Sequence, residues 1–313
     1  MARFNPRHLE EEFFQKFQPA QLAQPEGKFY GITQIVREDP YLNFEMRGSS
    51  VMIYYRGGKL LSINTNDELE GLDPKYSKDD TVEVPQPELE HISEYIDQAK
   101  HIIDKYENEI KDHLGEKEIQ QRVVFENNLS VNAANTDFFI VDTEWADVSL
   151  GGRADIMAFR WLRSSRRRKN EVQLTLIEVK QGTKSFKGDA GLQKHISDYE
   201  KLAKDPEYVK QVGEDMLEIL IQKHKLKLIK GLDDYLKNDK RPGINPNVDF
   251  IFLLANYHPY SSILAQTSES LPANSKFFIS SFMGYGLYYD FVKTKDELVS
   301  MFPDVFSKLK NKF

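Results

Sequence analysis

One segment, residues 174–180 (LTLIEVK), constrains the fold most, because it is apolar on both faces and yet ends in two ionisable residues. An apolar run of this kind is typical of a strand in the middle of a sheet, covered on both sides. Because side chains alternate along a strand, we expect Glu178 and Lys180 on the same side, about 7 Å apart along the chain. A buried carboxylate and a buried ammonium require compensating partners. The segment therefore predicts a central strand that ends in a polar site.

A second acid, Asp155, lies in the preceding segment, GGRADIMAF. The short connection between residues 152–162 and 171–180 predicts two antiparallel neighbours, in which the start of one strand lies beside the end of the next. We therefore expect Asp155 and Glu178 at the same edge of the sheet. Paired carboxylates are hard-oxygen ligands suited to Mg²⁺, which usually keeps several waters and also binds phosphate oxygens. The pattern predicts a site for Mg²⁺ (or Mn²⁺).

The remaining elements follow from hydrophobic periodicity. The stripe of apolar residues over 89–110 predicts a helix, and we favour its packing on the core of its own domain over a helix–helix seam between subunits. Further helices are expected at about 116–128, 188–204, 207–237 and 295–310. Further strands are expected at 137–144, 247–255 and 275–281. Strands mixed with helices that cross back over the sheet predict an α/β (α+β) fold with a central mixed sheet flanked by helices.

The first 87 residues are expected to form a small N-terminal β-rich module and a linker, and residues 88–313 a second domain. Strands are expected at 29–36, 50–56 and 59–63, with a tight turn at Gly57 and Gly58 between the last two. Residues 67–87 contain Asp, Lys, Ser and three prolines with little apolar content, which is typical of a linker.

The order helix, three strands, helix, strand, with Asp155 and a Glu178-x-Lys180 ending, resembles the PD-(D/E)xK, or restriction-endonuclease-like, nuclease superfamily over residues 116–255. The resemblance implies that Asp155 and Glu178 ligate the metal together with the backbone carbonyl of Val179. It implies that Lys180 positions the attacking water or helps to deprotonate it. The expected activity is hydrolysis of phosphodiester bonds, in DNA rather than RNA, in restriction, repair or defence. Ala154 stands where the proline of the family name would be.

The resemblance also implies two further groups. Gln193 would face the site from the following helix, although Tyr199 follows it by six residues rather than the usual four. An acid from the first helix often joins the site, and Glu116, Glu118 and Glu126 are candidates, of which we take Glu118. His195 is interpreted as incidental, because helix residues two apart point in different directions.

A basic run, residues 163–169 (RSSRRRK), falls in the turn between the two strands of the site. It is either a solvated turn or a phosphate-binding finger that includes Arg166, Arg167 and Arg168. The strand geometry places this turn at the end away from the carboxylates. Lys184 and Lys187 follow Lys180 closely and are nearer candidates for holding a nucleic-acid backbone.

The composition leaves a second class of function open. The net charge of −7 and the pI near 5.6 are unusual for a nucleic-acid binder, although a local basic patch can serve an acidic protein. The alternative is a catalytically inactive nucleic-acid-binding or scaffolding protein on the same fold. The absence of cysteine excludes disulfides and thiolate catalysis and fits a cytoplasmic protein. No apolar run is long enough to cross a membrane, and a homo-oligomer stays open.

Overall fold

The computed structural model describes residues 4–22, 24–77, 84–110, 115–147, 152–168, 170–181, 192–236, 240–255, 271–272, 275–280 and 284–301. The chain divides into two compact units. Unit 1 comprises Met1–Phe4, Asn135–Glu214 and Tyr235–Phe313, and unit 2 comprises Asn5–Ala134 and Asp215–Asp234. This division by contacts in space differs from the composition-based boundary at residue 87, because segments distant in the chain belong to each unit.

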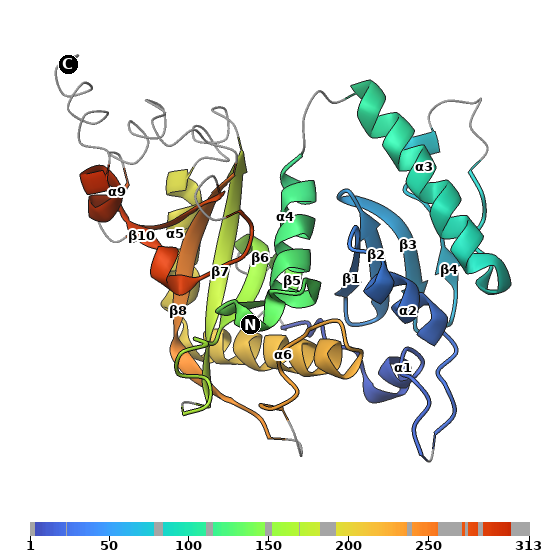
Figure 1. The fold of residues 1–313 in the computed structure, drawn as a ribbon, viewed down its shortest axis with the longest axis horizontal. Helices are drawn as coiled ribbons and strands as arrows, with labels where there is room; N and C mark the ends of the chain where they lie inside the picture. Colours follow the sequence, from blue (N-terminus) through green and yellow to red (C-terminus); the bar gives the residue numbers. More distant parts are fainter. Residues whose placement is uncertain are drawn as a thin grey trace. The chain divides into compact units, whose positions relative to one another are not determined.

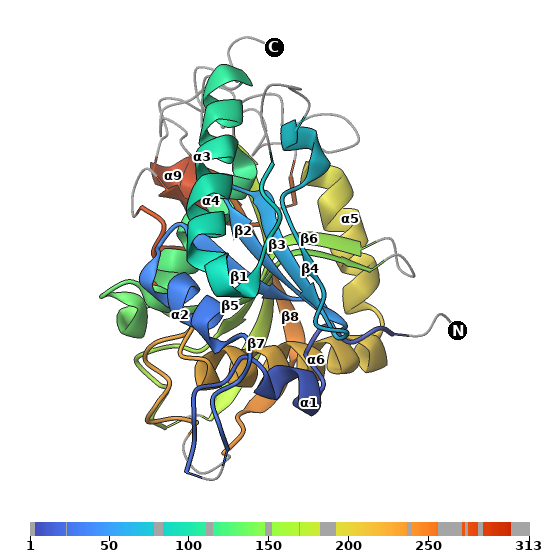
Figure 2. The same ribbon diagram turned by 90° about the vertical axis from the view of Figure 1, so that its right-hand side faces the viewer.

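Unit 2 contains a four-stranded antiparallel sheet in the order β1-β2-β3-β4 (Figures 1 and 2). The strands are β1 (Leu42–Met46), β2 (Ser50–Tyr55), β3 (Gly58–Asn64) and β4 (Leu69–Glu70). The helices are α1 (Glu11–Gln15), α2 (Tyr30–Glu38), α3 (Ile92–Ile110) and α4 (Glu116–Val124), which continues into a π-turn at Phe125–Leu129. The expected strands at 50–56 and 59–63 and the expected helices at 89–110 and 116–128 are confirmed.

The strand expected at residues 29–36 is wrong, because this segment forms α2. Its Ile, Thr and Val residues favour strands in isolation. Its buried residues, however, are Phe29, Ile32, Thr33 and Val36, whose spacing of three and four fits one face of a helix. The sheet instead begins with β1, for which the sequence analysis made no prediction.

The helix α3 packs on the four-stranded sheet of unit 2, whereas it was expected on the core of a domain over residues 88–313. Its buried face includes Ile96, Ala99 and Ile103, which are at most 1% exposed. The hydroxyl of Tyr95 donates to the carbonyl oxygen of Leu60 in β3, at 2.7 Å. Part of the expected linker is also packed, because residues 67–77 contain β4 and a 3-10 turn at Pro74–Ser77.

Unit 1 is built on a six-stranded mixed sheet in the order β10-β9-β8-β7-β6-β5 (Figure 1). The strands are β5 (Phe138–Asp147), β6 (Gly152–Arg160), β7 (Glu171–Gln181), β8 (Gly243–Ala255), β9 (Lys276–Ile279) and β10 (Lys293–Thr294). Antiparallel pairing joins β5, β6 and β7, whereas β7, β8 and β9 are parallel. The expected strands over 137–180, at 247–255 and at 275–281 are confirmed, and so is the antiparallel pairing that brings Asp155 towards Glu178.

Helices follow the first three strands. They are α5 (Leu192–Ala203), which packs on β6 and β8, and α6 (Pro206–Lys225), which begins in unit 1 and ends in unit 2. The last described helix is α9 (Lys295–Met301). The expected mixed α/β architecture is confirmed. No helix in the described ranges has the length and hydropathy needed to span a membrane.

Candidate active site

The register of β6 and β7 brings Asp155 and Glu178 to the same level of the sheet. This antiparallel ladder ends with the pair Ile156 and Ile177, and the next residues along the two strands are Asp155 and Glu178. Beyond that pair, the carboxylate of Asp155 replaces the backbone partner, because its Oδ2 accepts the backbone N–H of Val179 at 2.7 Å. The strand ends thus hold the two carboxylates side by side.

Glu178 and Lys180 form a buried ion pair at the end of β7. The Lys180 Nζ donates to the Glu178 Oε1 at 2.7 Å, and the two residues are 4% and 3% exposed. Their separation of two residues places both side chains on one face of the strand, while Val179 is buried on the other. The expected placement of both side chains on the same side of the strand is therefore confirmed, and in addition the two groups pair with each other.

The helix α5 supplies a second set of contacts to Glu178. The Tyr199 hydroxyl lies 2.8 Å from the carbonyl oxygen of Arg153 and 3.2 Å from the Glu178 Oε2, so its single hydrogen is shared between two acceptors. The Nε2 of His195 lies 3.0 Å from the Glu178 Oε1. Lys180 and Tyr199 therefore hydrogen-bond to opposite oxygens of this carboxylate, while the His195 Nε2 lies at ion-pair distance from Oε1 without a hydrogen bond to it.

The interpretation of His195 as incidental is wrong. His195 and Tyr199 are one helical turn apart and face the same way, with ring centroids 6.5 Å apart in a stacked arrangement. The sequence contained this signal, since a separation of four residues on a helix predicts a shared face. The resemblance instead pointed to the spacing between Gln193 and Tyr199, and the side chain of Gln193 lies outside the described residues.

A third acid lies on the other side of Asp155. The ladder of β5 and β6 pairs Thr143 with Ile156 and Trp145 with Ala154, which leaves Glu144 opposite Asp155. Glu144 is exposed and has a φ of 54°, a left-handed conformation that is uncommon for a residue with a side chain. No sequence motif indicated this residue. Its position depends on the β5–β6 register alone.

The site contains more carboxylates than ammonium groups, and the pKa shifts of its residues reflect this imbalance. Burial and the charge of Glu178 raise the pKa of Asp155 well above its usual value, against the opposing effects of the Val179 N–H and Lys180. Burial also raises the pKa of Glu178, and Lys180 opposes this rise. The pKa of the Tyr199 hydroxyl is raised by burial and by the charge of Glu178. Two carboxylates thus face one ammonium, an imbalance that a cation would relieve.

The donor set fits Mg²⁺. Within the described part of the chain, no three Asp, Glu or His side chains are grouped so that they could hold a metal ion. Two carboxylates are nevertheless sufficient for Mg²⁺, which is usually bound by one or two carboxylates together with waters and substrate phosphates. Asp155 and Glu178 could hold such an ion, whereas the described residues do not form a closed zinc site.

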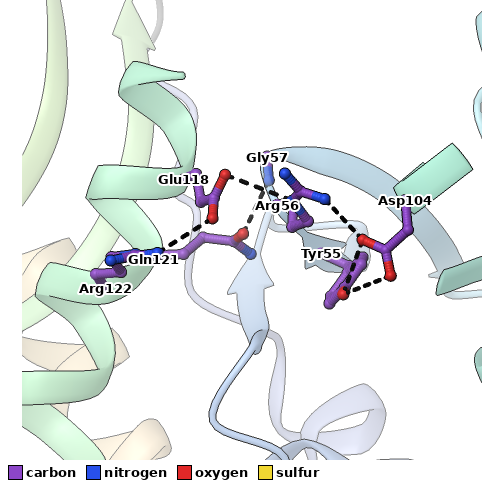
Figure 3. A network of polar contacts seen from close by, with 7 residues as sticks. All are labelled: Tyr55, Arg56, Gly57, Asp104, Glu118, Gln121 and Arg122. Carbon is purple, nitrogen blue, oxygen red and sulfur yellow. Dashed lines mark hydrogen bonds and ion pairs between the residues drawn. The ribbon is translucent and has the colours of Figure 1, made fainter. Parts of the chain in front are cut away.

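Glu118, the expected first-helix acid, has partners within unit 2 (Figure 3). Its carboxylate lies 3.4 Å from the Arg56 Nε and 3.4 Å from a terminal nitrogen of Arg122. Arg56 also donates to Asp104 of α3 at 2.8 Å. The side chain of Glu118 therefore helps to hold the β2–β3 turn between α3 and α4.

The same turn requires glycine at position 57. Gly57 has a φ of 78°, and a Cβ there would lie 2.3 Å from the Lys117 Cβ, so only glycine fits. Its N–H donates to the Gln121 Oε1 at 2.8 Å. The other first-helix candidates, Glu116 and Glu126, belong to the same unit.

The basic turn between β6 and β7 separates into one buried and several exposed residues. Arg166 is 2% exposed, and its guanidinium donates to the carbonyl oxygens of Trp161 and Thr136. Burial lowers its pKa to about 10. Arg166 is therefore a structural residue and not the phosphate contact that was expected, whereas Arg167 and Arg168 are exposed. Lys184 and Lys187 lie outside the described residues.

Comparisons with protein-family models, curated proteins and solved structures found no match to this chain.

Proposed function

We propose that this chain is a metal-dependent nuclease that hydrolyses phosphodiester bonds, in DNA rather than RNA, with a role in restriction, repair or defence. One observation carries the proposal. The end of β7 presents a buried Glu178–Lys180 pair, and Asp155 lies beside it on β6, fixed by the Val179 N–H. Two carboxylates and an ammonium at one edge of a sheet supply the groups that metal-assisted phosphodiester hydrolysis requires.

The order of elements supports the same proposal. The sequence α4, β5, β6, β7, α5, β8 agrees with the restriction-endonuclease-like order of helix, three antiparallel strands, helix and strand. The helix α6 is inserted between α5 and β8. In that core the carboxylates and the lysine lie on the second and third strands, as Asp155, Glu178 and Lys180 do here.

The residues of the site have separable roles. Asp155 and Glu178, with the Val179 carbonyl, would hold Mg²⁺, which when bound supplies Lewis-acid stabilisation of phosphoryl charge and a more acidic water. Lys180 adds a positive charge where negative charge develops on the phosphorus oxygens and where the attacking water must be oriented. Tyr199 and Lys180 hold the two oxygens of Glu178 in fixed directions, and His195 lies close to the oxygen that Lys180 contacts.

A cleavage assay tests the proposal. The substrates are linear and circular double-stranded DNA, single-stranded DNA and RNA, each with Mg²⁺ or Mn²⁺. Glu178→Gln and Lys180→Met are compared with Glu200→Gln, a substitution at an exposed position of α5 next to Tyr199. We expect cleavage by the wild type and by Glu200→Gln, and a loss of at least about 100-fold in the two site variants.

The outcomes separate the two classes of function. Cleavage that Glu178→Gln and Lys180→Met abolish supports the nuclease and these residues. No cleavage of any substrate, or activity that survives both substitutions, overturns the assignment. In that case the alternative, a catalytically inactive nucleic-acid-binding or scaffolding protein, becomes the better account.

A further inference from the structure

Two segments of unit 1 bring exposed cations together at the end of the sheet opposite to the carboxylates. The first is the turn between β6 and β7, and the second is the segment just before β8. They are joined at Asn170, whose side chain donates to the Arg241 carbonyl oxygen at 3.0 Å and whose carbonyl oxygen accepts the Gly243 N–H at 2.8 Å. We call the exposed cations of these segments the distal basic cluster: Arg163, Arg167, Arg168, Lys240 and Arg241.

The turn that carries three of these cations is firmly held. The buried guanidinium of Arg166 fixes it from inside through two carbonyl oxygens, and it lies 4.5 Å from the Phe139 ring centroid. The side chain of Arg168 donates to the Ser164 carbonyl oxygen at 3.2 Å. Arg166 therefore acts as an internal anchor that leaves its neighbours Arg167 and Arg168 at the surface.

The cluster is positive in a chain that is negative overall. Its described acidic neighbours include Asp137, whose carboxylate accepts the Arg163 backbone N–H at 2.7 Å, Glu214, whose carboxylate lies 4.0 Å from Arg241, and Glu171, which contacts Asn245. Five cations against these three acids form a local positive surface, while the whole chain carries a net charge of −7. A concentrated patch of this kind attracts polyanions such as a nucleic-acid backbone.

The distance from the distal basic cluster to the carboxylates determines how long a duplex must be to contact both. Glu178 and Glu171 lie on the same strand, β7, with seven residue steps between them. At about 3.3 Å per residue this is about 23 Å, and the basic turn begins just beyond Glu171. Because B-form DNA advances about 3.4 Å per base pair, the span corresponds to about seven base pairs.

We infer that the distal basic cluster binds the phosphate backbone of a duplex whose scissile phosphate lies at Asp155 and Glu178. The inference rests on the proposed nuclease function and adds a substrate requirement to it. A duplex must extend at least about seven base pairs from the cleaved bond to use both regions. Shorter substrates reach only the carboxylate end.

A binding experiment tests the cluster without cleavage. Fluorescence anisotropy in EDTA measures the affinity for a labelled duplex of about 30 base pairs between about 50 and 200 mM KCl. The variants are Arg167→Gln/Arg168→Gln and Lys240→Gln/Arg241→Gln. The control is Lys204→Gln/Lys210→Gln, which removes two exposed cations from elsewhere in unit 1. We expect each cluster variant to lower the slope of log Kd against log salt by up to about 1.8, which is two phosphate contacts, and the control to leave it unchanged.

A cleavage experiment with Mg²⁺ tests the length scale. The two cluster variants should raise KM for the long duplex but not for a hairpin with a stem of about five base pairs, which is too short to reach the cluster. Equal slopes for cluster and control variants, no duplex binding, or a KM that rises equally on both substrates would overturn the inference. A lowered slope without any cleavage would support the binding surface and count against the proposed nuclease activity, so the two failures are distinguishable.

Discussion

Each unit of the molecule contains a buried pair of glutamate and lysine, and the two pairs differ in what surrounds them. In unit 1, Glu178 and Lys180 lie 2.7 Å apart, with side chains at most 5% exposed. In unit 2, Glu45 and Lys223 lie 3.1 Å apart, with side chains at most 2% exposed. The distances and the burial are similar, so neither property separates a structural pair from a candidate active site.

The balance of charge separates them. The Glu45 carboxylate lies close to two cations, Lys223 at 3.1 Å and Arg47 at 3.8 Å. It also accepts a hydrogen bond from the Asn43 side chain at 2.7 Å. In unit 1 the ratio of acids to cations is the reverse, because the two acids Asp155 and Glu178 lie near the single ammonium of Lys180. A surplus of negative charge is what a divalent cation requires, whereas the unit 2 cluster contains its own compensation.

The positions in the chain also differ. Glu45 in β1 and Lys223 in α6 are distant in sequence, so their pairing contributes to the tertiary structure of unit 2. Glu178 and Lys180 are two residues apart on one strand, so their ion pair is local, and Tyr199 of α5 joins it through Glu178. Under the proposed function, this local pair serves the chemistry of the site.

The largest effect expected from this comparison is that replacing the glutamate by glutamine lowers the unfolding free energy much more in the unit 2 pair than in the unit 1 pair. Glu45→Gln removes the carboxylate that lies 3.1 Å from the buried Lys223 ammonium, and such a change typically costs about 3–5 kcal/mol of unfolding free energy. Glu178→Gln removes one of two repelling carboxylates and keeps a polar group for Tyr199 and Lys180. Without metal, we expect a smaller loss of unfolding free energy than for Glu45→Gln, because the carboxylate of Asp155 stays close to the Lys180 ammonium.

Chemical denaturation followed by two signals measures this difference. Both tryptophans, Trp145 and Trp161, are in unit 1, so their fluorescence reports on that unit, while far-UV circular dichroism reports on the whole chain. Equal destabilisation by Glu45→Gln and Glu178→Gln would show that charge balance does not distinguish the two pairs.

The second effect is stabilisation by metal. A ligand that binds only the folded state at about 100 times its Kd stabilises that state by about 2.7 kcal/mol. We expect Mg²⁺ to raise the midpoint of the tryptophan transition in the wild type and in Glu200→Gln. The rise should be absent in Glu178→Gln, because one of the two metal-binding carboxylates is lost. A rise of the same size in Glu178→Gln would place the metal elsewhere.

The sequence was sufficient to predict one strand pair and the residues on it. The apolar run before Glu178 predicted β7, the alternation of side chains predicted the orientation of Lys180, and the short connection predicted the antiparallel partner that carries Asp155. These are local rules, and they depend on residues within one or two strands. The error at residues 29–36 also has a local cause, since β-branched residues were given more weight than their helical spacing.

Contacts between distant elements could not be predicted in this way. The placement of His195 against Glu178 depends on how α5 packs on the sheet, and the position of Glu144 depends on the β5–β6 register. Arg166 is buried against the rings of Phe139 and Tyr235 and bonds to the Thr136 carbonyl oxygen, so its charge alone was misleading. Each of these three positions depends on partners that are far away in the chain.

The third effect concerns His195. This residue lies next to Glu178, and we expect it to act by positioning Glu178 and not by contacting substrate. Replacing a residue that orients a metal ligand typically costs about 10- to 100-fold in activity or metal affinity. We expect His195→Ala to fall in this range and His195→Gln, which keeps a polar group of similar reach, to recover part of the loss. The measurement is kcat and KM for cleavage at saturating Mg²⁺, together with the Mg²⁺ dependence. An equal loss in both variants would show that polarity at this position is unimportant.

The smallest effect lies in unit 2 and depends on pH. The hydrogen bond to Asp215, at 2.7 Å, raises the pKa of His8 above its usual 6.5. A raised histidine pKa means that the folded state binds the proton more tightly. The resulting stabilisation is complete below the unfolded pKa and is lost as the pH rises through the folded pKa. The pair is partly exposed, so we expect it to contribute no more than about 1 kcal/mol.

The test compares the thermal midpoints of wild type, His8→Gln and His101→Gln by circular dichroism at about pH 5.5 and about pH 8.5, on either side of the histidine range. His101 is an exposed residue of α3 in the same unit and serves as the control. We expect His8→Gln to lower the midpoint at the acidic pH and to have a smaller effect at the alkaline pH, because neutral His8 has already lost its charge-assisted bond. A deficit of equal size at both values would mean that the ring of His8 stabilises unit 2 by packing alone. In that case the contrast between the units would rest entirely on the fully buried pairs.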